Sequence, residues 1–596
     1  MLRPAIIGLA GVILIGIGTI SLFAVPPLVE ERIQESLVLE DGSQAFSLWK
    51  KAPVPVYNRF YFYNVTNPQA IEREGAKPIL RQIGPFTYEV SVEKVSIQNN
   101  HNGTLSYRER KSWRFRRSLS IADENYIVTT LNTPLALTLA LIQGASSTVR
   151  VLITLALDAV TEGFFIKRSI KQLLFDGYPD LLTTFGPLLN PEIPASSGGR
   201  FGFMYQKNNT DDGEYTIFSG VNDINLLNIM NRYNGKPKLT YWASDLCNSL
   251  NDSTNGQMRP PFTDRSPPQS IRIFSSDACR VLKLRFTRTH QPYPGLQVHR
   301  YTLDSTNFAS WREYSPNQCY MSRLPEPQPS LLYTLTRPQT TPIPTASPLQ
   351  SLPSSSSSST SSPSPHSDPA IPTSSSTPTQ SPHPRRQPNV FQQRHYRRSP
   401  FPSGVFDLSA CKYGAPLVIS QPHFLNSDPV YRKSVVGMMP NQSEHSFWMD
   451  SEPMTGSTVS LAARMQLNVA ITKGPAMFRY RNIPEIVFPI FWQEYQFAFT
   501  SDLAQALVDA KSMPHLVSSI SFYSLLLAGL ILAISSFLVY IIPYLRKHSL
   551  EINGKQIQTN ISNRVSVKDD REVLSRKASS NSSEEGIDNP SPVSIA

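Results

Sequence analysis

The sequence predicts an α+β protein, in which one β-rich outer body is held in a membrane by a helix at each end. Two runs without charged side chains, residues 5–25 and 516–544, predict the helices. At 1.5 Å per residue the first run is about 31 Å long, which matches the hydrocarbon core of a bilayer. Between the runs, alternation of apolar and polar residues surrounds one helical stretch, without a strand–helix repeat. This arrangement favours α+β over α/β.

The first apolar run is interpreted as an uncleaved anchor rather than a signal peptide. It is too long for an ordinary signal, and two prolines follow it where a small-residue cleavage site would stand. Arg3 precedes this run, whereas Arg546 and Lys547 follow the second, so the positive-inside rule places both ends in the cytosol. Residues 1–4 and 545–596 are therefore expected to be cytosolic, with a disordered polar tail after residue 548, and residues 26–515 form the outer body.

The outer body carries the signals of an oxidising, glycosylating compartment. It contains all four cysteines of the chain, an even number that favours two disulfides in a secretory lumen but leaves three pairings open. It also contains five N-x-S/T sequons, which are acceptors for N-glycans. The sequon asparagines are Asn64, Asn102, Asn208, Asn251 and Asn441. Asn560 and Asn581 match as well, but they lie in the expected cytosolic tail and should stay unmodified.

The segments of the outer body are expected in the following order. Residues 56–95 read as strands around a Gly84-Pro85 turn, and Asn102-Gly103 predicts a hairpin. In the strand after this hairpin, Tyr107, Glu109, Lys111 and Trp113 share one face and the arginines lie on the other. Residues 122–175 read as helical, and residues 271–286 read as a strand pair.

Residues 324–400 form a Pro/Ser-rich insertion. Such a composition cannot bury enough apolar surface to offset its ordering entropy, so the insertion is expected to be disordered. Five of its arginines cluster near its end: Arg385, Arg386, Arg394, Arg397 and Arg398. This cluster is a candidate protease-processing site or a docking patch for anionic polymers, although a solvated loop with incidental charge is the preferred interpretation.

Motifs for covalent chemistry are absent from the sequence. It contains no G-x-S-x-G elbow, no H-E-x-x-H, no C-x-x-C and no P-loop, and its ten histidines lack metal-ligand spacing. We therefore expect no enzyme activity, no metal and no cofactor. Basic residues alternate with aromatic ones near Trp113, but the outer location of this segment argues against a nucleic-acid partner.

Residues 54–90, VPVYNRFYFYNVTNPQAIEREGAKPILRQIGPFTYEV, resemble the opening of the class B scavenger receptor family. Further similar stretches follow in order at residues 212–220, 239–248, 271–280, 406–425 and 450–469. The resemblance covers nearly the whole chain except the insertion and the tail. It implies a β-barrel-like core with a helical cap at residues 127–175, and an internal tunnel that carries lipid.

The resemblance also implies particular site residues. By position it pairs Cys247 with Cys319 and Cys279 with Cys411. A lysine that the family associates with fatty-acid entry has no counterpart in this chain. The basic residues closest to that place are Lys167, Arg168 and Lys171. They are candidate ligand contacts, with Lys167 and Lys171 expected on one helix face, although an ordinary solvated face is the preferred interpretation.

The function implied by the resemblance is that of a receptor for lipids or lipoproteins (fatty acids, sterols and phospholipids), which mediates their uptake or transfer. Anionic polymers and protein ligands are further candidate partners at the cap. Two alternatives stay open: a lysosomal membrane receptor that traffics a luminal hydrolase, and an adhesion receptor for matrix or pathogen ligands. We expect the plasma membrane as the location, with the lysosomal or endosomal membrane as the alternative.

Overall fold

A computed structural model describes residues 2–143, 147–183, 199–261, 267–320, 401–473 and 480–574. The chain divides into two compact units. One contains Met1–Arg32 together with Ala510–Ala596, and the other, which we call the body, contains Ile33–Asp509. The expected insertion at residues 324–400 lies outside the described residues.

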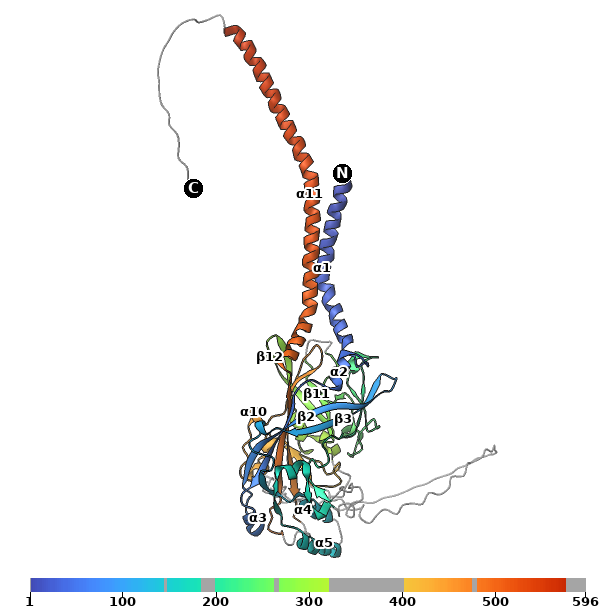
Figure 1. The fold of residues 1–596 in the computed structure, drawn as a ribbon, viewed down its shortest axis with the longest axis vertical. Coiled ribbons are helices and arrows are strands. Elements are labelled where there is room, and N and C mark those ends of the chain that lie inside the picture. The colour runs from blue at the N-terminus through green and yellow to red at the C-terminus, as the bar shows by residue number, and fades with distance from the viewer. Residues whose placement is uncertain are drawn as a thin grey trace, which may run out of the picture. The chain divides into compact units, whose positions relative to one another are not determined.

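The body is built on one 14-stranded, largely antiparallel sheet that curls into a nearly closed barrel (Figure 1). An antiparallel bridge between Ile229 and Thr254 connects the two ends of the sheet. The strand order is β10 (Ser253–Thr254), β11 (Ser270–Ser275), β12 (Arg280–Tyr293), β13 (Leu296–Leu303), β16 (Trp448–Ser451), β17 (Thr458–Ile471), β18 (Ile486–Ala498), β1 (Val56–Val65), β2 (Leu80–Asn99), β3 (Thr104–Phe115), β8 (Glu214–Phe218) and β9 (Met230–Tyr233). Two further strands, β14 (Val405–Asp407) and β15 (Leu417–Ser420), branch from β17.

The body also contains short helices and two small sheets besides this barrel. The described helices of the body include α2 (Gln44–Lys50), α3 (Pro68–Glu74), α4 (Thr133–Ile142), α5 (Ser147–Val160), α7 (Asp245–Asn248), α9 (Pro429–Lys433) and α10 (Gln442–His445). Two small antiparallel sheets pair β4 (Ile127–Leu131) with β5 (Phe165–Ser169) and β6 (Tyr178–Pro179) with β7 (Arg200–Phe201). Figure 1 shows α4 and α5 at one end of the body. The chain enters and leaves the body at the other end.

Aromatic strand residues build the main core beneath these helices. In β1 the side chains of Phe60, Phe62 and Tyr63 are fully buried, and the strand pairs with both β2 and β18. Alternate residues of the adjoining strands meet them from each side, as the period of two requires. The apolar run RFYFYNV thus becomes a central strand because both of its edges are hydrogen-bonded.

The expected turn at Gly84-Pro85 is wrong, because both residues lie inside β2. The register between β1 and β2 shifts at this point, from Phe60 opposite Phe86 to Phe62 opposite Ile83. A β-bulge of this kind absorbs an extra residue and lets the ladder continue. The hairpin expected at Asn102-Gly103 is confirmed, since it connects β2 and β3. The strand pair expected at residues 271–286 is confirmed as β11 and β12.

The helical interpretation of residues 122–175 is only partly right. Helices α4 and α5 lie within this range, but β4 precedes them and β5 follows them as an antiparallel pair. Ile127, Val128 and the two threonines after them are β-branched, and such side chains favour a strand over a helix. The cap therefore contains, besides α4 and α5, a small two-stranded sheet and a short helical segment at Gln172–Asp176.

The other unit contains two long helices, α1 (Leu2–Ser36) and α11 (Ser501–Leu574), which run on into the body at one end. Both are long and apolar enough to cross a membrane. Within this unit they approach closely, since a Cβ on Gly11 would lie 2.7 Å from the carbonyl oxygen of Gly529. Such contacts between small residues are typical of packed membrane helices.

Helix α11 corrects one expectation. It continues to Leu574, so the polar stretch after residue 548 is helical rather than disordered over its described part.

Candidate functional site

The cap contains apolar side chains beyond those that pack in the core. Asn132 caps the start of helix α4, because its side-chain oxygen accepts a hydrogen bond from the Leu135 amide, and Pro134 lies in the first turn. The sequence TPLALTLALI is apolar on nearly all sides, and most of its side chains are buried. A helix of this kind must be surrounded, and α4 contacts β17 while its buried side chains join the main apolar core.

A small apolar pocket lies between α4 and the end of β17. Its lining residues are Ala136, Leu139, Ala140, Gln143, Phe164, Ala470, Ile471 and Thr472, and its cavity volume is about 10 Å³, which is room for about one water molecule. Gln143 closes one side by donating from Nε2 to the Thr472 carbonyl at 3.2 Å. Pockets that hold drug-sized ligands are about 300–1,000 Å³. The described pocket is therefore a small apolar recess that would have to widen to admit an acyl chain, and the internal tunnel is not among the features that these residues show.

Helix α5 presents an apolar face to solvent. Leu152 and Leu155 are 62% and 63% exposed, and Val151 and Val160 are exposed as well. Leu157, on the opposite side of the helix, is buried in the core. Residues three and four apart share a helix face, so Val151, Leu152 and Leu155 form one continuous strip. Exposed apolar patches of this kind mark interaction surfaces more often than chance.

The three basic residues singled out from the sequence do not form a helical face, and this expectation is wrong. Lys167 and Arg168 lie in β5, opposite Thr129 and Val128 of β4, because pairing with that β-branched strand extends the backbone. Arg168 forms an ion pair with Glu162 and stacks over the Tyr178 ring.

Lys171 follows this strand and lies 3.3 Å from a carboxylate oxygen of Asp176 and 3.7 Å from one of Glu124. The Asp176 contact and the charges of both carboxylates raise the pKa of Lys171. The structure therefore gives Arg168 and Lys171 acidic partners and leaves Lys167 as the exposed base. Their role as ligand contacts stays a prediction.

Both expected disulfides are present. Cys247 bonds to Cys319 and Cys279 bonds to Cys411, with Cα atoms 5.8 and 6.4 Å apart. All four cysteines contribute to one apolar cluster around Trp242. The second bridge joins the sequence before the insertion to the sequence after it, so the disulfide closes the base of the insertion.

The sequons differ in how far the asparagine is exposed. Asn102, Asn208, Asn251 and Asn441 are exposed on the body surface. Asn64 lies in β1, is half-buried, and accepts a hydrogen bond from the Thr129 amide at 2.8 Å. Glycosylation of these positions stays a prediction.

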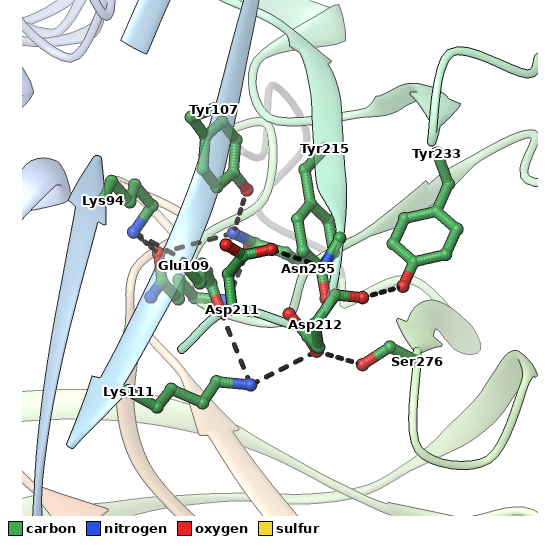
Figure 2. A network of polar contacts seen from close by, with 12 residues as sticks. Lys94, Tyr107, Glu109, Lys111, Asp211, Asp212, Tyr215, Tyr233, Asn255 and Ser276 are labelled. Atoms are coloured by element: carbon green, nitrogen blue, oxygen red, sulfur yellow. Dashed lines mark hydrogen bonds and ion pairs between the residues drawn. The ribbon is translucent and has the colours of Figure 1, made fainter. Parts of the chain in front are cut away.

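A charged network in the barrel was missed by the sequence analysis (Figure 2). Lys94, only 1% exposed, donates from Nζ to the Trp49 carbonyl at 2.7 Å and to Gln257 at 2.5 Å, and Glu109 lies 3.9 Å away. Its ammonium also lies 4.8 Å from the centre of the Trp49 ring. Burial lowers the pKa of Lys94 to about 8, although Glu109 opposes this shift.

The other half of the network is centred on Lys111 and Asp212, whose charged atoms are 3.4 Å apart. Burial disfavours the charge on Lys111, but Asp212 and Glu109 overcome this and raise the pKa of Lys111. Asp212 also accepts hydrogen bonds from Ser276 and Tyr215. The alternation predicted for Tyr107, Glu109 and Lys111 places these side chains on the inner face of β3, where the network forms. Nothing in the sequence marks Lys94 as their partner, because its pairing depends on Trp49 and Gln257 from distant segments.

Two buried histidines form a second polar cluster. The rings of His423 and His445 stack with their centres 4.4 Å apart. Nδ1 of His423 accepts from the Met439 amide at 3.1 Å, and its Nε2 lies 2.6 Å from Oε1 of Gln82. Desolvation, followed by the charge of His445, lowers the pKa of His423 to about 3. Both rings are thus held neutral, and their spacing of 22 residues gave no sequence signal of contact.

Among the residues that the structure describes, no group of three or more His, Cys, Asp or Glu side chains is arranged to hold a metal ion. Most polar atoms of the clusters described above are paired internally, but Oδ1 of Asp212 and Nε1 of Trp49 have no hydrogen-bond partner in the described part of the chain, and neither Lys94 nor His423 reaches solvent. Buried polar networks make a fold more rigid through their paired members. The exposed apolar strip of α5 and the pocket beside α4 are therefore the parts of the body best suited to meet a ligand.

Comparison with known proteins places these features in context. The model of the CD36 family matches residues 8–540. Scavenger receptor class B member 1 of Mus musculus is 27% identical over 531 residues, which cover 89% of this chain and 87% of that relative. Lysosome membrane protein 2 of Homo sapiens is 28% identical over 468 residues, covering 78% of this chain and 79% of that relative. The same protein of Mus musculus is 27% identical over 497 residues, with 83% and 85% covered.

Proposed function

Because the chain belongs to the CD36 family, we propose that it is a membrane receptor that binds lipids or lipoproteins and mediates their uptake. It is a scavenger-receptor-like membrane protein with two apolar helices long enough to span a bilayer. We propose further that an apolar passage in the body carries the lipid.

The pocket beside α4 is the observation that carries this proposal. Six of its eight lining residues are apolar, and two amide or hydroxyl side chains, Gln143 and Thr472, stand at its edge. An acyl chain gains about 0.8 kcal/mol for each methylene that leaves water, so a passage that opens from this apolar recess would favour its carbons. No covalent step is required, because transfer only exchanges one apolar environment for another. We propose this pocket as the outer mouth of the passage.

Cells that express the chain test this proposal. A phenylalanine at Ala140 fills the pocket from a partly exposed helix position, so A140F is expected to lower the uptake of fluorescent fatty acid or labelled sterol ester severalfold. L137F is the matched control, because it adds the same ring on α4 outside the pocket. Uptake by the native chain no higher than in untransfected cells, at verified surface expression, would contradict the proposal. Equal uptake by A140F and the native chain would remove the pocket from the path.

A protein ligand at the cap is a second candidate function, favoured by the exposed apolar face of α5. Lipids enter pockets, whereas a flat apolar strip on a helix suits a partner surface. The similarity to lysosome membrane protein 2 makes a lysosomal membrane location as suitable as the plasma membrane. In this alternative the cap carries a luminal hydrolase. Microscopy with markers of each membrane separates the two locations.

A further inference from the structure

The outer face of three neighbouring strands gathers positive charge. On β11, β12 and β13 the inward side chains, such as Ile271, Leu284 and Tyr301, form an apolar cluster. The opposite face carries five cations, which we call the β12 basic face: Arg272, Lys283, Arg285, Arg288 and Arg300. A bulge between Phe286 and Arg288 keeps Arg288 on the same face as Arg285, since Arg285 opposes Thr302 and Arg288 opposes Arg300.

The register sets like charges directly against each other in two places. Arg272 lies opposite Lys283, and Arg288 lies opposite Arg300. Side chains in such pairs have Cβ atoms about 5 Å apart, and like charges there are destabilising. Such unfavourable like-charge pairs are expected mainly where the surface serves a function. A bound anion would convert each repulsive pair into an attractive contact.

Few carboxylates neutralise this face. Asp304 contacts Arg285 at 3.0 Å and Lys283 at 4.0 Å, and Asp450 contacts Arg300 at 2.7 Å. Both aspartate side chains are fully buried, whereas the Arg285 side chain is 65% exposed and Arg288 is also exposed. For Arg272 and Arg288 no ion pair is found among the described residues. The surface that solvent meets is therefore strongly cationic.

We propose that the β12 basic face binds a linear sulfated polysaccharide. From Lys283 to Arg288 the charges extend roughly 16 Å along the strand, and neighbouring strands lie about 4.8 Å apart. The cations therefore form an extended flat array rather than a compact site for a single anion. Within β11, β12 and β13 no large hydrophobic side chain is exposed. A membrane-binding surface would need such anchors, so the array suits a soluble polyanion better than a lipid surface. This site is separate from the cap and does not depend on lipid uptake.

Heparin binding by the purified full chain tests the proposal. The chain is held in zwitterionic lipid nanodiscs, and Arg385, Arg386, Arg394, Arg397 and Arg398 are changed to Gln so that the insertion does not contribute. In this background the test variant is R272Q/R288Q, which breaks no ion pair of the described residues. The matched control is R114Q/K207Q, which removes two exposed charges from another surface. Affinity for immobilised heparin is measured at low and high salt.

We expect R272Q/R288Q to bind heparin about tenfold more weakly than the background chain, and the control to change by less than about twofold. The difference should shrink at high salt, because screening weakens exposed charges. Without heparin, the thermal midpoint of R272Q/R288Q should equal or exceed that of the background, since repulsion is relieved. Heparin should raise the midpoint of the background chain more than that of R272Q/R288Q.

Three outcomes would overturn the proposal. The background chain could fail to bind heparin. The control could instead lose as much affinity as R272Q/R288Q, which would show that heparin binding depends on net charge alone. R272Q/R288Q could instead keep heparin binding while losing binding to phosphatidylserine vesicles, which would assign the face to an anionic lipid surface. A lowered thermal midpoint in R272Q/R288Q would show that the like-charge pairs are not repulsive.

Discussion

Buried ionisable side chains are the residues on which the body depends most. Lys94 holds three groups from distant segments, namely the Trp49 carbonyl, Gln257 and Glu109 (Figure 2). Removing one partner of a buried charge leaves the others unsatisfied, which costs far more than the net value of the pair. The sequence could place Glu109 on the inner face, but it could not show that Lys94 meets it.

Replacing Lys94 with methionine is therefore expected to destabilise the body by about 3–5 kcal/mol, because Glu109 and the Trp49 carbonyl would lose their donor. Thermal unfolding of the purified chain measures this, together with the amount that reaches the cell surface. K50M is the control, since Lys50 is exposed at the end of α2 and its loss should cost less than about 0.5 kcal/mol. An unchanged midpoint for K94M would show that the network does not support the fold.

The histidine pair predicts an acid limit on stability. His423 titrates with a pKa of about 3 in the fold and about 6.5 when unfolded, so the fold favours the neutral ring. Its contribution is complete above about pH 6.5 and is lost progressively as the pH falls toward 3. At pH 5 the expected loss is about 2 kcal/mol, because 1.36 kcal/mol accompanies each unit below 6.5.

Unfolding measured at pH 7 and pH 5 checks this. H423Q removes the titrating group, so its stability should fall less between the two pH values than that of the native chain. H101Q is the control, since His101 is exposed and should leave the pH dependence unchanged. If H423Q and the native chain lost equal stability on acidification, the buried histidine would not be the acid-sensitive group.

Among the elements, strands were easier to predict than the cap. Alternating side chains identified β3 and its two faces, and Asn102-Gly103 identified its hairpin, because both signals are local. The cap sheet was missed, since β4 and β5 are five residues each and are separated in sequence by two helices. Pairing across that distance is decided by tertiary contacts, which no short window contains. For the same reason, the sequence did not show that Lys167 lies in a strand.

The exposed apolar face of helix α5 leads to a testable prediction. L152Q/L155Q replaces two exposed leucines on its outer face, so the fold should be unaffected while binding of a protein ligand at the cap falls about tenfold or more. Pull-down with a candidate luminal hydrolase at matched surface expression measures the effect. L157A is the contrasting variant, because Leu157 is buried and its truncation should cost about 2–5 kcal/mol in stability. Full hydrolase binding by a folded L152Q/L155Q variant would exclude this face.

For the whole molecule, the resemblance supplied what residue patterns could not. Composition and hydropathy indicate two spans and one large body, but they leave three disulfide pairings open. The resemblance selected Cys247–Cys319 and Cys279–Cys411, and both are present. The barrel depends on pairs such as β1 with β18, whose residues are more than 400 positions apart. Contacts of this range come only from the folded chain or from a known relative.

The orientation of the two membrane helices is the last prediction. Arg546 and Lys547 follow the second apolar run, and residue 3 is an arginine that precedes the first, so both ends should face the cytosol. Tags at either end should stain only after cells are permeabilised, and endoglycosidase should lower the mass of the chain by removing glycans from the body. N560Q should not change the mass, because Asn560 lies in α11 beyond the second apolar run, where the chain is expected to be cytosolic. An N102Q variant is the positive control, since Asn102 is exposed on the body. Staining of intact cells, or a glycan on Asn560, would invert the topology and place the body in the cytosol, where its two disulfides would not be expected to persist.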